Sequence, residues 1–117
     1  MKLRIHVGGE VATATLNGSA AARDFAALLP LSLSLKDYAV VERIADLPRK
    51  LDVVGAPEGM APAAGDITHY APWGNLAIFV HGHKYERGLV RLGKVDSGLA
   101  LLQRPGPLQV RIERTSD

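Results

Sequence analysis

The chain has 117 residues, a formal net charge of +2 from 14 basic and 12 acidic side chains, and no cysteine. This length fits one domain that can bury a core without disulfides or metals, and 47% hydrophobic residues indicate a folded chain. So small a positive charge argues against nucleic-acid binding through phosphate neutralisation, and the lack of cysteine excludes thiolate catalysis and cysteine-ligated metals.

The amino-terminal segment lacks the continuous apolar run of a signal peptide, because charged and apolar residues alternate over residues 1–6. No stretch approaches the roughly 18 apolar residues that a membrane-spanning helix needs. We therefore expect a cytoplasmic protein of bacterial type that has no membrane partner.

The first third of the chain predicts one helix among strands. Alternating polarity predicts strands over residues 2–7, 10–16 and 31–36. Gly8-Gly9 favours a two-residue hairpin between the first two strands, because both positions tolerate positive φ. Ser19 can cap a helix over residues 20–29, and Pro30 ends it.

The middle of the chain is less regular. Residues 38–51 are ambiguous, and Glu42 to Leu47 could form a short helix before Pro48. Residues 55–65 contain five glycines and prolines without periodicity, which predicts an ordered loop or a flap over a site.

The remaining third predicts four more strands, over residues 66–70, 76–80, 89–95 and 108–113. Residues 71–74 form a turn, and Asp96 or Ser97 can cap a short helix through Leu102. About seven short strands with one or two short helices must hide their sheet edges, and closure into a barrel does so. We therefore predict a mainly β fold in which the terminal strands pair.

A family resemblance begins at residues 89–95, Leu-Val-Arg-Leu-Gly-Lys-Val, and continues through residues 96–102. This segment resembles the late strand–turn–helix of cyclophilins, in which an apolar strand ends in Phe-Gly-Lys-Val. Gly65-Asp66 and residues 74–79 are similar to two segments of the cyclophilin groove. With residues 47–51 and 70–79 the chain resembles the small bacterial cyclophilin-like proteins of unassigned function, which implies a closed barrel of about eight strands and a single cyclophilin-like domain over 1–117.

Cyclophilins are peptidyl-prolyl isomerases, and the resemblance places candidate groove residues. Phe79 falls where the pocket phenylalanine would be, whereas the groove histidine falls on Leu89 and the groove glutamine near Ala63. The groove tryptophan falls near residues 84–85. Arg49 is the nearest upstream arginine, and it is the candidate catalytic residue.

Two of the six aromatic residues, Tyr70 and Trp73, flank a Pro-containing turn. They either pack at the barrel rim or form an aromatic wall for a ligand. We predict a groove that residues 55–65 cover and that has Arg49 at one end. Its ligand-binding residues are Tyr70, Trp73, Asn75, Phe79 and Met60.

His81 and His83 would share one face of a strand, and His69 could join them as a third metal ligand. The alternative is a solvated strand end, and we predict no metal and no cofactor. The first functional hypothesis is a binding module for a short peptide or a small organic ligand. The alternatives are a peptidyl-prolyl isomerase with a rebuilt site and an oligomeric partner protein that uses the apolar strand over residues 76–80.

Overall fold

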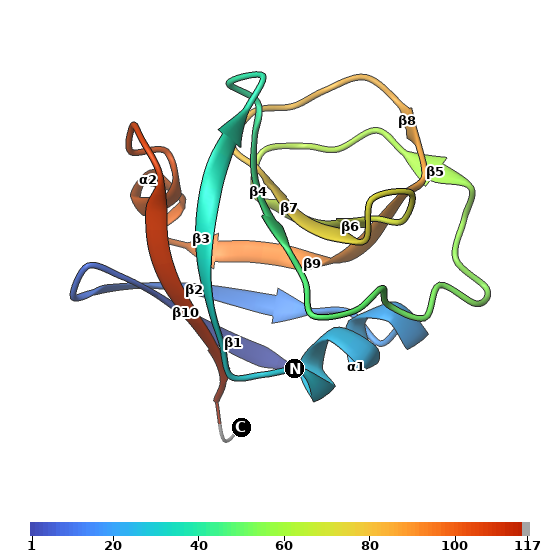
Figure 1. Ribbon diagram of the computed structural model, residues 1–117, viewed down its shortest axis with the longest axis horizontal. Helices are drawn as coiled ribbons and strands as arrows, with labels where there is room; N and C mark the ends of the chain where they lie inside the picture. The colour runs from blue at the N-terminus through green and yellow to red at the C-terminus, as the bar shows by residue number, and fades with distance from the viewer. Residues whose placement is uncertain (116–117) are drawn as a thin grey trace.

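Eight antiparallel strands close into a barrel in the computed structural model, which describes residues 1–115 (Figure 1). Around the barrel the order is β1, β10, β3, β4, β7, β6, β9 and β2. The barrel strands are β1 (Lys2–Val7), β2 (Glu10–Leu16), β3 (Leu31–Tyr38), β4 (Glu42–Asp46), β6 (Asp66–Tyr70), β7 (Asn75–Phe79), β9 (Leu89–Ser97) and β10 (Leu108–Arg114). This confirms the predicted closed, mainly β fold.

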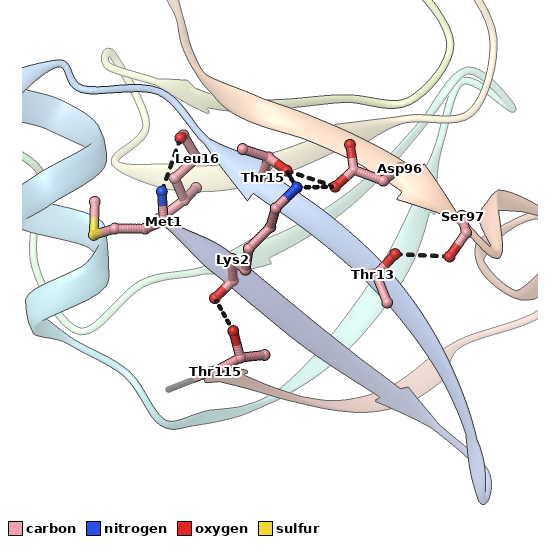
Figure 2. A network of polar contacts seen from close by, with 8 residues as sticks. All are labelled: Met1, Lys2, Thr13, Thr15, Leu16, Asp96, Ser97 and Thr115. Atoms are coloured by element: carbon pink, nitrogen blue, oxygen red, sulfur yellow. Dashed lines mark hydrogen bonds and ion pairs between the residues drawn. The ribbon is translucent and has the colours of Figure 1, made fainter. Parts of the chain in front are cut away.

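The first and last strands pair directly, as predicted. Leu3 of β1 lies opposite Arg114 of β10, and Gly8 and Gly9 form the hairpin to β2 with positive φ. On the outer face a polar network joins β1, β2 and β9 (Figure 2). Lys2 Nζ donates to Thr15 Oγ1 at 2.8 Å and lies 3.6 Å from Asp96. These strands therefore have one solvent-exposed face and one buried face.

The barrel interior holds the main hydrophobic core. In β1 the side chains of Leu3, Ile5 and Val7 are buried, while their neighbours are exposed or half-buried. Helix α1 (Ala20–Ala27) adds Phe25, which is fully buried. Ser19 caps this helix as predicted, since its Oγ accepts a hydrogen bond from the Ala22 amide at 3.1 Å.

The possible helix over residues 42–47 is wrong, because residues 42–46 form β4 between β3 and β7. Arg43 and Ala45 face the interior, whereas Ile44 packs on the outside. The sequence pattern did not predict this strand, because the inward position of Arg43 is charged and breaks the alternation of polar and apolar residues. Arg43 is 2% exposed, and its guanidinium donates to the Leu102 carbonyl at 3.0 Å and to the Gly106 carbonyl at 2.6 Å.

The predicted cap at Asp96 or Ser97 is also wrong. Strand β9 runs through Ser97, whose hydroxyl hydrogen-bonds Thr13 at 2.7 Å, and α2 (Leu99–Leu102) begins after Gly98. Gly98 has a φ of 83°, and a Cβ there would lie 2.9 Å from Ala12. A left-handed residue so close to β2 has to be glycine.

The segment over residues 55–65 is an ordered loop that contains β5 (Gly59–Met60). This strand pairs with β8 (Glu86–Arg87) in a separate two-stranded sheet. At the end of the loop, Asp66 accepts a hydrogen bond from the Ala63 amide at 2.8 Å. The loop is therefore held at its middle by β8 and at its end by Asp66. Within residues 1–115 no helix is long and apolar enough to cross a membrane.

Candidate ligand-binding site

A second hydrophobic cluster lies outside the barrel, on the outer face of its central strands. Because side chains alternate along a strand, Leu76 and Ile78 of β7 face the main core, while Ala77 and Phe79 face outward. Phe79 is only 1% exposed, since residues of the surrounding strands and loops cover it. The cluster consists of Ala77, Phe79 and Leu89, with Val41, Ile44, Met60 and Tyr70 packed against it.

Beside this cluster is a cavity of about 150 Å³, which we call the aromatic pocket. Phe79 and Leu89 form apolar parts of its wall, and Tyr38, Tyr70 and Trp73 supply three further aromatic side chains. This volume corresponds to roughly five water molecules. The pocket therefore suits a small chemical group and not a folded chain.

Trp73 is the central ring of the aromatic group. Its ring centroid lies 5.6 Å from that of Tyr38 and 5.3 Å from that of Tyr70, with interplanar angles of 83° in both pairs. Edge-to-face contacts of this kind stabilise aromatic groups beyond simple burial. The tryptophan nevertheless remains 55% exposed, which leaves much of the indole open to a ligand.

The turn between β3 and β4 places Tyr38 opposite Glu42, at the rim of the pocket. Its two central residues, Ala39 and Val40, have φ values of 53° and 61°. This conformation disfavours residues with a Cβ, above all a β-branched valine. The pocket rim thus contains a strained turn.

Besides the tyrosines, four polar side chains line the same cavity: Glu42, Asn75, His83 and Glu86. Glu42 lies at the start of β4, Glu86 belongs to β8, and Asn75 begins β7. Burial raises the pKa of Glu42, and the nearby Glu86 carboxylate raises it further. Asn75 is 3% exposed, and its Oδ1 has no hydrogen-bond partner among the described residues.

A larger, apolar cavity of about 430 Å³ lies next to the aromatic pocket. The two share Leu89 as a wall residue. The larger cavity is bounded by the start of α1, by β9 and by residues 54–60. The loop that was predicted to cover the groove therefore borders this neighbouring cavity, while residues 38–42 and 83–86 frame the aromatic pocket.

The structure brings four of the predicted ligand-binding residues together: Tyr70, Trp73, Asn75 and Phe79 all line the aromatic pocket. Met60, the fifth, packs against the outer cluster and lines the neighbouring cavity. Whether any of these side chains binds a ligand stays a prediction. Tyr70, Asn75 and Phe79 come together because they face outward on β6 and β7, and Trp73 lies in the turn between these strands.

Arg49, the candidate catalytic residue, is not brought to the aromatic pocket. Its guanidinium forms two hydrogen bonds with the Asp24 carboxylate of α1, at 2.6 and 2.7 Å. The Asp52 amide also donates to Asp24 at 2.7 Å. The hydrogen bond from Arg49, followed by that from Asp52, lowers the pKa of Asp24 to about 2. Arg49 therefore ties the segment after β4 to the helix.

The histidines occupy separate environments. His69 is fully buried; its Nδ1 donates to the Asn75 carbonyl at 3.0 Å, and its Nε2 accepts from the Leu51 amide at 3.3 Å. Burial lowers the pKa of His69, which favours this neutral form. His81 and His83 are exposed, and His83 lines the aromatic pocket. Within residues 1–115 no three acidic or histidine side chains are grouped to hold a metal ion.

Sequence reasoning missed Tyr38, Glu42 and Glu86 as wall residues of the aromatic pocket. Tyr38 and Glu42 lie in the segment that was ambiguous, and Glu86 lies in a strand of two residues. A signal existed only for Tyr38, as one of the few aromatic residues next to a possible turn.

The chain is therefore a closed antiparallel β-barrel protein with a small pocket on the outer face of the barrel. The chain belongs to the Cyclophilin-like family, whose model matches residues 5–113. It is similar in structure to a hypothetical protein from Archaeoglobus fulgidus, with a TM-score of 0.72 and 16% identity over 98% of this chain and 95% of that one. At this identity the likeness shows the fold alone. We found no match among curated proteins.

These comparisons confirm the family that the sequence resembles. The structural neighbour is archaeal, whereas the sequence resemblance was to bacterial proteins. No activity comes with either comparison, so the function has to be argued from the pocket itself.

Proposed function

We propose that this cyclophilin-like domain is a binding module whose aromatic pocket takes a small organic molecule or one side chain of a short peptide. The observation that carries the proposal is Trp73, a half-exposed indole held between two tyrosines at the mouth of a cavity. Large apolar side chains left open in a concave site are typical of ligand-binding surfaces.

Part of the pocket wall belongs to the outer hydrophobic cluster. Phe79 is buried beneath the pocket, and Tyr70 packs against the same cluster. A preformed site loses little conformational entropy on binding. This supports binding of small ligands by a rigid wall, with Trp73 as the exposed contact.

The experiment is a fragment screen by ligand-observed NMR, with Trp73→Ala as the test variant. Trp73 is the one tryptophan of the chain, so its fluorescence also reports binding in the unmodified protein. We expect fragments that quench Trp73 to bind at least tenfold more weakly to Trp73→Ala, which corresponds to about 1.4 kcal/mol. Removal of a half-exposed ring should leave the fold intact.

Val11→Ala serves as the matched control, because Val11 is a 43% exposed apolar side chain on β2 outside the pocket. Equal binding to Trp73→Ala and to the control would show that the pocket is wrongly placed. A screen without any fragment that perturbs Trp73 would reject the binding function.

Peptidyl-prolyl isomerisation is the weaker candidate. The outward-facing Phe79, with Met60 and Leu89 beside it, is the feature that favours it. Against it, the residues that line the aromatic pocket include no arginine, and Arg49 is engaged with Asp24. A protease-coupled assay with a prolyl peptide separates the two candidates.

A further inference from the structure

The wall of the aromatic pocket carries two carboxylates, those of Glu42 and Glu86. Among the described residues that line the pocket there is no lysine or arginine, and the exposed imidazole of His83 is the one basic side chain. A ligand that brings positive charge or a hydrogen-bond donor to this wall would therefore meet two carboxylates.

Arg43, the basic residue next to Glu42 in sequence, lies on the opposite face of β4. Arg43 points into the barrel, where it lies 3.0 Å from Asp37 and donates to the carbonyls of Leu102 and Gly106. Glu42 therefore lacks an ion pair with this neighbour. Its raised pKa reflects burial and the like charge of Glu86, and a cation in the pocket would oppose both effects.

The aromatic rings add a second, independent attraction for positive charge. Trp73 stands nearly perpendicular to both Tyr38 and Tyr70, so the three rings do not share a plane. Ring faces attract cations through their quadrupoles, and groups of aromatic rings of this kind recognise ammonium ligands. Tryptophan is the strongest of these rings for this contact.

We infer that the aromatic pocket binds an organic ammonium group, either a protonated amine or a methylated one. This inference rests on the binding function proposed above and specifies its ligand class. The rings would contact the alkyl or methyl groups, and Glu42 and Glu86 would face the charge or its N–H groups. The cavity of about 150 Å³ accommodates such a head group alone.

The first test compares choline with 3,3-dimethylbutan-1-ol, a neutral molecule of the same shape, and with n-butylammonium, which carries N–H donors. Binding is measured through Trp73 fluorescence and through chemical-shift changes in ¹⁵N-labelled protein. We expect both cations to bind at least tenfold more tightly than the neutral isostere, or about 1.4 kcal/mol. Equal affinity for choline and its isostere would overturn the inference.

The second test is Glu42→Gln, which removes the charge and keeps the shape. We expect choline to bind roughly tenfold more weakly to this variant, while the affinity for the neutral isostere is unchanged. Glu10→Gln is the matched control, because Glu10 loses the same charge on the β1–β2 side, where it pairs with Arg104. Unchanged choline binding by Glu42→Gln would also overturn the inference.

The outcomes separate this inference from the function on which it rests. If uncharged or anionic fragments bind the pocket and the ammonium probes do not, the binding module stands and the ammonium ligand is rejected. If no fragment and no ammonium probe perturbs Trp73, both are rejected.

The probes also distinguish two sources of the ammonium group. Blocked lysine, N-acetyl-lysine methylamide, and its trimethylated form are compared with n-butylammonium and choline. Tighter binding of the lysine compounds indicates a peptide side chain, and tighter binding of the simple amines indicates a free small molecule.

Discussion

The outer face of the barrel is polar over the terminal strands β1 and β10 and apolar over β7, beside the aromatic pocket. We call these regions the terminal side and the pocket side. Strands β1 and β10 alternate buried and solvent-facing residues, whereas all five residues of β7 are buried. The outer face of the terminal side carries exposed polar contacts such as Lys2 with Thr15 and Asp96. The outer face of the pocket side carries a second hydrophobic cluster.

The contrast shows how the site is built. Exposed ion pairs contribute little to stability. The terminal strands are therefore stabilised mainly by the side chains that they bury in the barrel interior. On the pocket side, β5, β8 and the β3–β4 turn cover the outward residues of β7 and leave a cavity beside Phe79. The pocket therefore lies where the segments that bury the outer face of β7 do not fill all the space beside it.

The largest expected effects come from adjacent residues on opposite faces of β7. Ile78→Ala in the barrel interior and Phe79→Ala in the outer cluster should each lower the free energy of unfolding by about 3–4 kcal/mol, because both side chains are fully buried. Urea denaturation measures this. Only Phe79→Ala should also weaken binding of the fragments that quench Trp73.

If Phe79→Ala costs less than about 1 kcal/mol, the outer cluster is not a true second core. Should either alanine variant fail to fold, Ile78→Val and Phe79→Leu make the same comparison at roughly 1 kcal/mol.

A medium effect is expected at the Arg49–Asp24 pair, which lies outside the pocket. The folded-state pKa of Asp24 is about 2, below its ordinary value, so its contribution to stability is complete above about pH 4 and is lost as pH falls towards 2. We expect Asp24→Asn to cost about 1–2 kcal/mol at pH 6, with less difference from the unmodified chain near pH 2.

Denaturation at pH 6 and at pH 2.5 checks this prediction. The same difference at both pH values would show that the ion pair does not cause the lowered pKa. Arg49→Met should reproduce the loss at pH 6, because it leaves Asp24 with the Asp52 amide alone.

The smallest effect has the opposite sign. Glu42 has a raised pKa in the folded protein, so the folded state binds more protons and stability falls as pH rises above about 4.3. Glu42→Gln should therefore stabilise the free protein by roughly 0.5 kcal/mol at pH 7 and flatten this slope. The other titratable groups that line the pocket with Glu42, which are Tyr38, Tyr70, His83 and Glu86, are unchanged in this variant.

Thermal unfolding between pH 4 and 8 measures the change. A Glu42→Gln variant that is less stable at every pH would mean that the carboxylate has a structural partner. Together with weaker ammonium binding, higher stability would be the signature of a residue kept for function.

Closure of the barrel was predicted from the need to hide sheet edges and from the family resemblance. Local patterns predicted most of the strands, because the terminal strands alternate strictly and the hairpin glycines are explicit. They failed at β4, where the inward residue is Arg43, a charged side chain whose partners in α2 and β3 lie elsewhere in the chain. The cap of α2 was missed because Gly98 is selected by close contact with β2, which no neighbouring residue reveals.

Part of the candidate site was predictable for a similar reason. Tyr70, Trp73, Asn75 and Phe79 lie on one hairpin, so their proximity follows from the local sequence. The acidic wall comes from β4 and β8, which only the tertiary fold brings to that hairpin. Arg49 was assigned by its position in the sequence, and its partner Asp24 lies 25 residues away.

Closure of the barrel also limits how another chain could dock. Each of its eight strands has a hydrogen-bonded neighbour on both sides, which leaves few backbone rows that an extended peptide could join as an extra strand. The exception lies between β3 and β4, because β4 pairs only with residues 36–38 of β3, while residues 31–35 pair with β10 on the other side. Within the described residues, β5 and β8 are the strands with one neighbour each. A peptide that binds by strand addition would thus approach beside Met60 or along residues 31–35 of β3, and recognition elsewhere has to use side chains.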